Sequence, residues 1–264
     1  MAQLAFERRP WRTAGWIALV AYVLYAASRL DFTSERFSVG MDNAARFLGR
    51  MFPPEILQAD SMVRGLLESL EISVLASVAG IILAAPLGVL AARNLMPPWV
   101  SWPARGLIAL CRSFHPVIVA ILFVKAVGFG ALAGILTLTV ASLGFIGKLF
   151  AEAIEEISLK QVEAIRATGA RFGGVLAYGV LPQVMSRFVG FATYQVDSNL
   201  RNSTMVGIVG AGGIGSTLFA AFQRFDYSFV CAILLAIIAM IMVGETLARV
   251  VRGMLGIDAR RSDA

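Results

Sequence analysis

The chain has 264 residues, of which 58% are hydrophobic and only 15% are charged, with a formal net charge of +6. Its mean hydropathy is +0.76. Soluble domains are about 45–50% apolar and about 25% charged, and a soluble core of this size cannot enclose so much apolar side chain. The composition excludes a soluble enzyme or nucleic-acid-binding domain and indicates a protein whose apolar excess faces lipid.

Six apolar runs are long enough to cross a membrane, which takes about 20 mostly apolar residues in a helix. In chain order they are Trp11–Leu30, Ile72–Ala92, Leu107–Val124, Ala126–Gly147, Phe188–Val209 and Tyr227–Gly244. We therefore predict an all-α, polytopic membrane protein with six transmembrane helices. The first run follows Arg8 and Arg9, has Arg12 at its start and could pass for a signal peptide, but it ends in a poor cleavage site. We interpret it as an uncleaved anchor.

The basic residues are distributed unevenly between the loops on the two sides of the membrane. With the N-terminus inside, fourteen Lys and Arg residues fall in inner segments and four in outer segments. Because basic residues favour the cytoplasmic side, both termini and the long loop at 148–187 are predicted to be cytoplasmic. We expect an N-terminal anchor and outer segment over residues 1–61, a transmembrane core over 62–252 and a cytoplasmic tail over 253–264.

The loop at 148–187 has the most informative pattern in the chain. Lys160–Ala170 predicts a short amphipathic helix ended by Gly169, with an apolar face from Val162, Ile165 and Ala167–Gly169. A second helical stretch runs to Leu181-Pro182, where proline marks the start of the next span. Such a helix is either a docking surface for a cytoplasmic partner or a helix lying in the lipid interface.

Glu163-Ala164, Gly169 and Leu181-Pro182 resemble the EAA loop of binding-protein-dependent ABC importer permeases. Ile165 stands where that motif has a second alanine, and Gly179 where an aliphatic residue is usual. In that family the loop forms a coupling helix that inserts into a groove on a cytoplasmic ATPase. The resemblance implies an ATPase-coupling role for six residues: Glu163, Ala164, Arg166, Gly169, Leu181 and Pro182.

The run Ser203–Gly215, taken together with Glu163–Gly169, is similar to the phosphonate permeases of that family. The resemblance implies a bacterial inner-membrane subunit that pairs with a second permease copy and two ABC ATPase subunits and receives its substrate from a periplasmic binding protein. It implies a phosphonate as the substrate, with phosphite or phosphate as variants. Methionine importers have a related segment, so methionine or another small solute is the alternative. An ATP-independent secondary transporter would need a second broken segment, which the sequence does not show.

The segment Gly210–Gly215 matches the G-x-G-x-x-G fingerprint, but it follows a membrane span and lacks the soluble strand–helix context of a dinucleotide site. We interpret it as a gate or a break in a membrane helix, because glycine permits bending and close backbone approach. The residues concerned are Gly210, Gly212, Gly213 and Gly215. The chain also has no G-x-x-x-x-G-K-S/T loop, so ATP and Mg are expected to bind a partner ATPase and no cofactor to bind this chain.

A polar band interrupts the fifth apolar run. Its members are Asp197, Asn199, Arg201, Asn202, Ser203 and Thr204. Asp197 and Arg201 are four residues apart, which places them on one helix face. Ionisable groups inside a span need a partner or a water-filled path. The band therefore either lines a passage for an anion or forms an ion pair that seals helices or two subunits together.

The sequence predicts no catalytic residues and no metal site. It contains one histidine, His115, and its cysteines Cys111 and Cys231 lie in apolar runs without metal-ligand spacing. A membrane-embedded enzyme would need a cluster of carboxylates, histidines or a nucleophile with its base. His115 is followed by Pro116, which predicts a kink in the third span.

Overall fold

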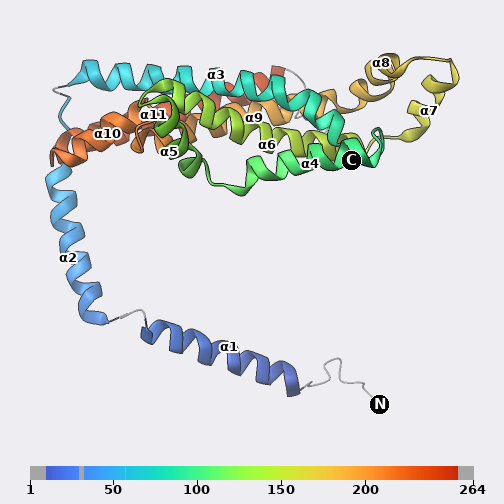
Figure 1. The fold of residues 1–264 in the computed structure, drawn as a ribbon. Helices are drawn as coiled ribbons and strands as arrows, with labels where there is room; N and C mark the ends of the chain where they lie inside the picture. The colour runs from blue at the N-terminus through green and yellow to red at the C-terminus, as the bar shows by residue number, and fades with distance from the viewer. Residues whose placement is uncertain (1–9, 30–32, 57, 255–264) are drawn as a thin grey trace. The chain divides into compact units, whose positions relative to one another are not determined.

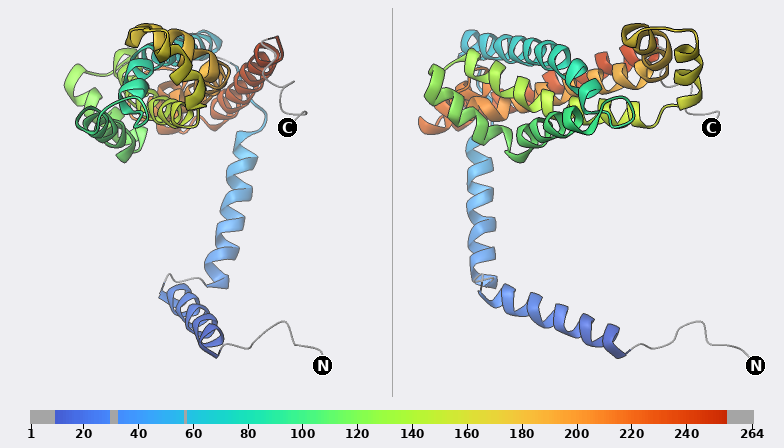
Figure 2. Two further views of the ribbon diagram at one scale, coloured as in Figure 1. Left: turned by 90° about the vertical axis from the view of Figure 1, so that its right-hand side faces the viewer. Right: turned by 45° about the vertical axis from the view of Figure 1, so that its right-hand side comes forward.

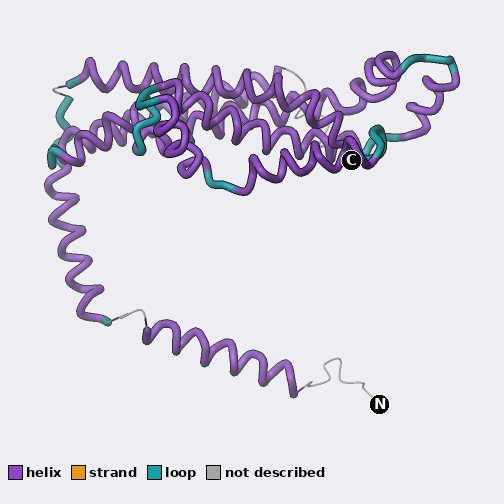
Figure 3. Tube along the Cα trace, viewed as in Figure 1, coloured by secondary structure: helices purple, strands orange, loops and turns teal. Residues whose placement is uncertain are grey.

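The computed structural model describes residues 10–29, 33–56 and 58–254, and every regular element in those ranges is a helix (Figures 1 and 3). The prediction of an all-α fold is confirmed. The chain divides into two compact units, Met1–Pro53 and Pro54–Ala264. Leu30, the arginines at 8 and 9, and residues 255–264 of the predicted tail lie outside the described residues.

The first unit contains two helices, α1 (Pro10–Arg29) and α2 (Ser34–Met51). α1 coincides with the first predicted span. No helix was predicted for the segment that forms α2. Yet Phe37, Met41 and Leu48 recur there at helical spacing between charged residues, and their side chains are exposed. α2 is therefore an amphipathic helix.

Three long helices of the second unit lie side by side along their lengths: α3 (Ala59–Ala91), α6 (Ala131–Glu155) and α9 (Leu181–Ile208) (Figures 1 and 2). α11 (Tyr227–Met254) packs against α9. α3 begins at Ala59 rather than at Ile72, because helical hydrogen bonding continues through polar residues. An ion pair between Arg64 and Asp60 at 2.9 Å spans its first turns. The apolar run thus identified the most apolar part of α3 but not the residue at which the helix begins.

The third predicted span is broken into α4 (Pro98–Ser113) and α5 (Pro116–Val127), which meet at 91°. The predicted kink at His115-Pro116 is confirmed, as a complete break. Pro116 lacks an N–H and sits in the first turn of α5, and His115 caps that helix by accepting the Val117 N–H at 3.3 Å. The predicted start of the span at Leu107 is wrong, because α4 already begins at Pro98.

The predicted start of the fourth span at Ala126 is also wrong. α5 continues to Val127, and two glycines with positive φ, Gly128 (91°) and Gly130 (126°), separate it from α6. α6 then runs to Glu155, beyond the predicted end at Gly147. Glycine tolerates φ values that other residues rarely adopt, so the turn and not the hydropathy sets this boundary.

The loop at 148–187 contains α7 (Leu159–Ala167), the three-residue α8 (Phe172–Gly174) and the π-helical segment η1 (Val175–Val180). η1 leads into α9, so one helical stretch extends over Phe172–Ile208. α7 and α8 lie at the end of the bundle where α6 ends and α9 begins (Figures 1 and 2).

After α9 the chain forms α10 (Ile214–Gln223), which runs antiparallel to the first turns of α3. Ser69 Oγ in α3 accepts the Ile214 N–H at 2.9 Å, and at the far end Arg224 donates to Gln58 at 3.3 Å. α10 is too short to cross a membrane. It therefore packs as a side element on the bundle.

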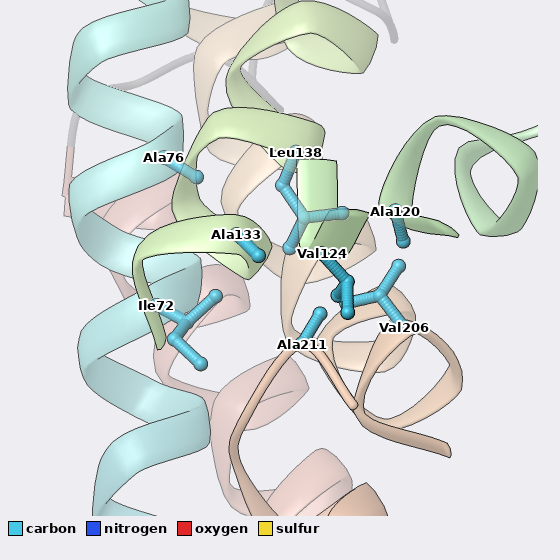
Figure 4. Close-up of a cluster of buried hydrophobic side chains, with 8 residues drawn as sticks. All are labelled: Ile72, Ala76, Ala120, Val124, Ala133, Leu138, Val206 and Ala211. Carbon is cyan, nitrogen blue, oxygen red and sulfur yellow. The ribbon is translucent and has the colours of Figure 1, made fainter. Parts of the chain in front are cut away.

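A buried apolar cluster joins α3, α5, α6 and α9 near the glycine-rich segment (Figure 4). Its residues are Ile72, Ala76, Ala120, Val124, Ala133, Leu138, Val206 and Ala211. Half of them are alanine, which lets helix backbones approach closely where lipid offers no hydrophobic drive for association.

Four described helices are long and apolar enough to cross a membrane: α3, α6, α11 and the stretch containing α9. Counting the bent pairs α1/α2 and α4/α5 as one span each raises the number to six. The predicted six spans thus equal the upper count for the described residues.

Candidate coupling and transport sites

The short helix α7 is held against η1 by two apolar residues. Val162 is only 2% exposed and Ile165 is half-buried. Both face Gly179 of η1, where a β-carbon would lie 3.5 Å from the Val162 Cα. Val162 belongs to a buried cluster that also includes Phe150 of α6 and Val184 of α9. This face of α7 was predicted, whereas Ala167–Gly169 is exposed and takes no part in the packing.

Polar contacts between the two ends of the loop also stabilise the position of α7 against η1. The Arg187 guanidinium in α9 pairs with the carboxylate of Glu156, which follows α6. The Gln183 side chain accepts the Ser158 N–H at 3.0 Å and donates to the Gly179 carbonyl at 2.6 Å. These contacts connect the end of α6 to the beginning of α9, so α7 is attached to both helices.

The opposite face of α7 is free of the bundle. Glu163, Ala164 and Arg166 are all exposed. Gly169 adopts φ +77° and donates its N–H to the Arg166 carbonyl at 3.0 Å, which ends the helix as predicted. The structure therefore presents a short, capped helix with one face buried against η1 and one face exposed.

Leu181 and Pro182 form the first turn of α9, directly after η1. Leu181 is half-buried within the cluster around Val162, and Pro182 is exposed. Proline suits a helix start because its missing N–H would be unpaired there. These two residues thus belong to the support of α7 and not to its exposed face.

The polar band of α9 is divided between two faces of the helix. Asn199 is fully buried and donates through its Nδ2 to Ser77 of α3 at 2.9 Å and to Ser142 of α6 at 2.8 Å. Gln195 donates to Ser142 at 3.0 Å and to Asn199 at 2.9 Å. Satisfied networks of this kind fix helix packing. Asn199 thus cross-links α3, α6 and α9 and faces no passage within the chain.

Ser203 shares this interior position. It is fully buried and donates to the carbonyl of Leu200 at 2.8 Å, one turn back in α9. Asn202 is half-buried and contacts Ser198 at 3.4 Å. The side chains that the sequence placed together in one band are therefore not on one surface.

Asp197, Arg201 and Thr204 occupy the other face. Arg201 pairs with Asp197 Oδ2 at 2.8 Å, and the two side chains are 42% and 11% exposed, respectively. Asp197 Oδ1 and Thr204 Oγ1 are buried and have no hydrogen-bond partner among the described residues. A carboxylate normally accepts several hydrogen bonds. On this face of α9, two buried oxygen atoms of the polar band therefore have no hydrogen-bond donor or acceptor among the described residues.

Loss of the Asp197–Arg201 pair should be asymmetric. Arg201→Ala leaves a mostly buried carboxylate without its cation, at a cost of about 3–5 kcal/mol. Asp197→Ala leaves a guanidinium that is 42% exposed and therefore less enclosed than the carboxylate, so it should cost less. The double variant should be more stable than Arg201→Ala alone. Thermal unfolding of the four full-length proteins in one detergent measures the cycle, and additive effects of the two substitutions would contradict a coupled pair.

The glycine-rich segment spans the turn between α9 and α10, and its last glycine, Gly215, lies in the first turn of α10. Gly210, Gly212 and Gly213 have φ values of 93°, 79° and 75°. A β-carbon at Gly212 would lie 2.7 Å from Glu68 Oε1 of α3, and the Gly130 N–H donates to the Gly210 carbonyl at 3.0 Å. The segment is thus a break between helices, packed tightly between α3 and the turn that precedes α6.

Sequence reasoning missed Gln183, Gln195 and the Glu156–Arg187 pair. Gln195 lies four residues before Asn199, so an i, i+4 polar pair in an apolar run was an available signal. Gln183 and the Glu156–Arg187 pair act across the loop, between residues far apart in the sequence. Nothing in the local pattern indicates such partners.

The chain belongs to the family of binding-protein-dependent transport system inner membrane components, because residues 84–260, more than half of its length, match that family. It is thus a permease-type, multi-pass inner-membrane component. It is 39% identical to the phosphite transport system permease protein PtxC of Stutzerimonas stutzeri, over 92% of this chain and 89% of that protein.

Two further comparisons agree with this assignment. The chain is 37% identical to the phosphate-import permease protein PhnE of Mycolicibacterium smegmatis, over 91% of this chain and 45% of that protein. Its fold is similar to a chain of the MetNI methionine ABC transporter in an inward-facing conformation, with a TM-score of 0.64 and 25% identity, over 73% of this chain and 95% of that one.

Proposed function

We propose that this chain is the membrane-spanning permease subunit of an ATP-driven importer for a small phosphorus oxyanion, phosphite or a phosphonate. The observation that carries the proposal is α7, a short capped helix seated on η1 with its Glu163 face exposed. A helix attached to both α6 and α9 passes a displacement by a docked partner directly to the bundle. That partner is a separate ATPase, and the chain itself performs no covalent chemistry.

The orientation follows from the charges. With the N-terminus inside, fourteen basic residues fall in the segments predicted to be inner and four in those predicted to be outer, which favours a cytoplasmic α7 and cytoplasmic termini. A binding protein then delivers substrate on the opposite side. Two permease copies enclose the passage, and the second copy supplies hydrogen-bond partners for Asp197 Oδ1 and Thr204 Oγ1, which have none among the described residues.

The relatives support a phosphorus oxyanion over methionine. Identity to the phosphite permease is 39% over 92% of the chain, whereas identity to a probable D-methionine permease of Vibrio cholerae is 26% over 46%. Asp197 and Arg201 together carry no net charge, so the passage needs further cations to favour an anion. A second copy adds another neutral Asp197–Arg201 pair, so cations that favour an anion would have to come from elsewhere along the passage.

Uptake measurements test the substrate. Deleting the chain from a cell that expresses its ATPase and binding protein should reduce phosphite uptake by about tenfold or more, because without the passage no other route couples ATP to transport. Restoring the chain should recover uptake, and the purified chain alone should hydrolyse no ATP. Unchanged uptake of phosphite and phosphonates, together with loss of methionine uptake, would reject the proposed substrate class.

A further inference from the structure

The end of α3 with the turn after it, the second half of α4 and the end of α6 line an open cavity of about 250 Å³, and none of its lining residues belongs to α7 or α9. Four basic side chains and one acidic side chain line it: Arg93, Arg105, Arg112, Lys148 and Glu152. The remaining lining residues are apolar. Figures 1 and 2 show α4 lying along α6 on this side of the bundle.

Two of the four cations already have anionic partners. The Arg105 guanidinium pairs with Glu155 and donates through Nε to the Ala91 carbonyl at 2.8 Å. Lys148 pairs with Glu152 at 3.4 Å. The same Glu155 oxygen, Oε1, also accepts the backbone N–H of Arg93 at 2.8 Å. The two carboxylates near the cavity, Glu152 and Glu155, therefore each already have a cationic partner.

The guanidinium groups of Arg93 and Arg112 have no such partner. Within the described residues, none of the ion pairs of the chain includes either group. The lining thus holds an excess of positive charge that the protein does not compensate. Both side chains are exposed, so their guanidinium groups are accessible to an anion from outside the chain.

The backbone is shaped to place Arg112 at this position. A β-carbon at Gly144 of α6 would lie 2.7 Å from Arg112 Cγ and 3.0 Å from Cys111 Cβ. Glycine at this position therefore lets α4 approach α6 and lets the stem of Arg112 cross over α6. Ile108 and Ala151, both buried, form the adjacent apolar wall. The cavity therefore combines an apolar wall with two guanidinium groups that have no ion-pair partner among the described residues.

We propose that this cavity is a binding site for a phosphate group, held by Arg93 and Arg112. Guanidinium forks match the oxygen geometry of phosphate and bind it through paired, charge-assisted hydrogen bonds. The excess positive charge matches an anion of one or two negative charges. The phosphate group comes either from an anionic phospholipid, since basic pockets between membrane helices hold such headgroups, or from a free oxyanion. The site is formed within one chain and does not depend on the substrate proposed above.

Binding to the full-length chain in nanodiscs tests the site in two arms. One arm titrates phosphatidylglycerol into phosphatidylcholine discs, and the other titrates inorganic phosphate into discs of phosphatidylcholine alone. The midpoint of thermal unfolding reports binding in both, because a ligand that binds only the folded state raises it. Arg112→Gln and Arg93→Gln should each weaken binding by about tenfold or more in the arm that contains the true ligand.

Two further variants keep the result interpretable. Arg249→Gln removes an exposed arginine of α11 that does not line the cavity, and it should bind like the wild type. Arg112→Lys keeps the charge but loses the fork, so it should fold even where Arg112→Gln does not and should still bind more weakly. A loss confined to the lipid arm assigns a phospholipid headgroup, and a loss confined to the phosphate arm assigns a free oxyanion. Wild-type affinity of the cavity variants in both arms, or an equal loss in Arg249→Gln, would overturn the site.

Discussion

Glu163→Lys in α7 is expected to abolish coupled transport while leaving the chain folded and inserted. Glu163 is exposed, and the packing of α7 on η1 depends on Val162 and Ile165 instead. A reversed charge at a small docking surface costs about 2–4 kcal/mol at an interface hot spot. That cost lowers affinity for the ATPase by a factor of about 30 or more.

Copurification of the ATPase and uptake in whole cells measure this effect. Glu245→Lys makes the same charge change at an exposed position of α11, away from α7. It should leave both readouts at wild-type level. Membrane levels of the two variants should match, which separates uncoupling from failed insertion. A Glu163→Lys protein that retains its ATPase and transports normally would show that α7 is not the docking surface.

Gly215→Ala should destabilise the whole bundle. Its β-carbon would press on the carbonyl oxygen of Thr204 and lie 2.9 Å from the Gly207 Cα, so the obstacle is backbone and cannot rotate away. Overpacking against rigid neighbours costs about 1–3 kcal/mol and sometimes more. We expect the upper end, because α10 and the end of α9 would have to separate.

The matched control is Gly106→Ala in α4, where no heavy atom lies within 4 Å of an added β-carbon. Removing glycine from an unobstructed helix position should be neutral or stabilising by about 0.5–1 kcal/mol. Thermal unfolding of both variants in one detergent compares them directly. Equal stability of the two variants would mean that the α9–α10 turn yields more easily than its contacts indicate.

The helical spans and the glycine-ended helix in the long loop were predictable because they depend on local pattern. Hydropathy located the apolar cores of α3, α6, α9 and α11, and Gly169 marked the end of α7. Helix ends were placed less well. Polar residues such as Asp60 extend a helix without changing its hydropathy, and the glycine turn before α6 overrides an unbroken apolar run.

The division of the polar band could not be read from sequence. Spacing showed that Asp197 and Arg201 share a face, and that pairing is present at 2.8 Å. It could not show that Asn199 faces the bundle, because that depends on where Ser77 and Ser142 lie in two distant helices. Likewise, the basic cavity collects Arg93 from the turn after α3, Arg112 from α4 and Lys148 from α6, and only the packing of these segments brings them together.

The π-helical segment η1 has a geometric consequence for the seat of α7. A π-helical turn accommodates one more residue than an α-helical turn, and one residue corresponds to about 100° of rotation and 1.5 Å of rise. The direction in which α7, which packs through Val162 and Ile165, projects from the axis of α9 therefore depends on that single extra residue. In a homologous chain with a regular α-helix at Val175–Val180, the short helix would project from the bundle in a different direction. A partner whose surface fits the helix in one direction would not fit it in the other.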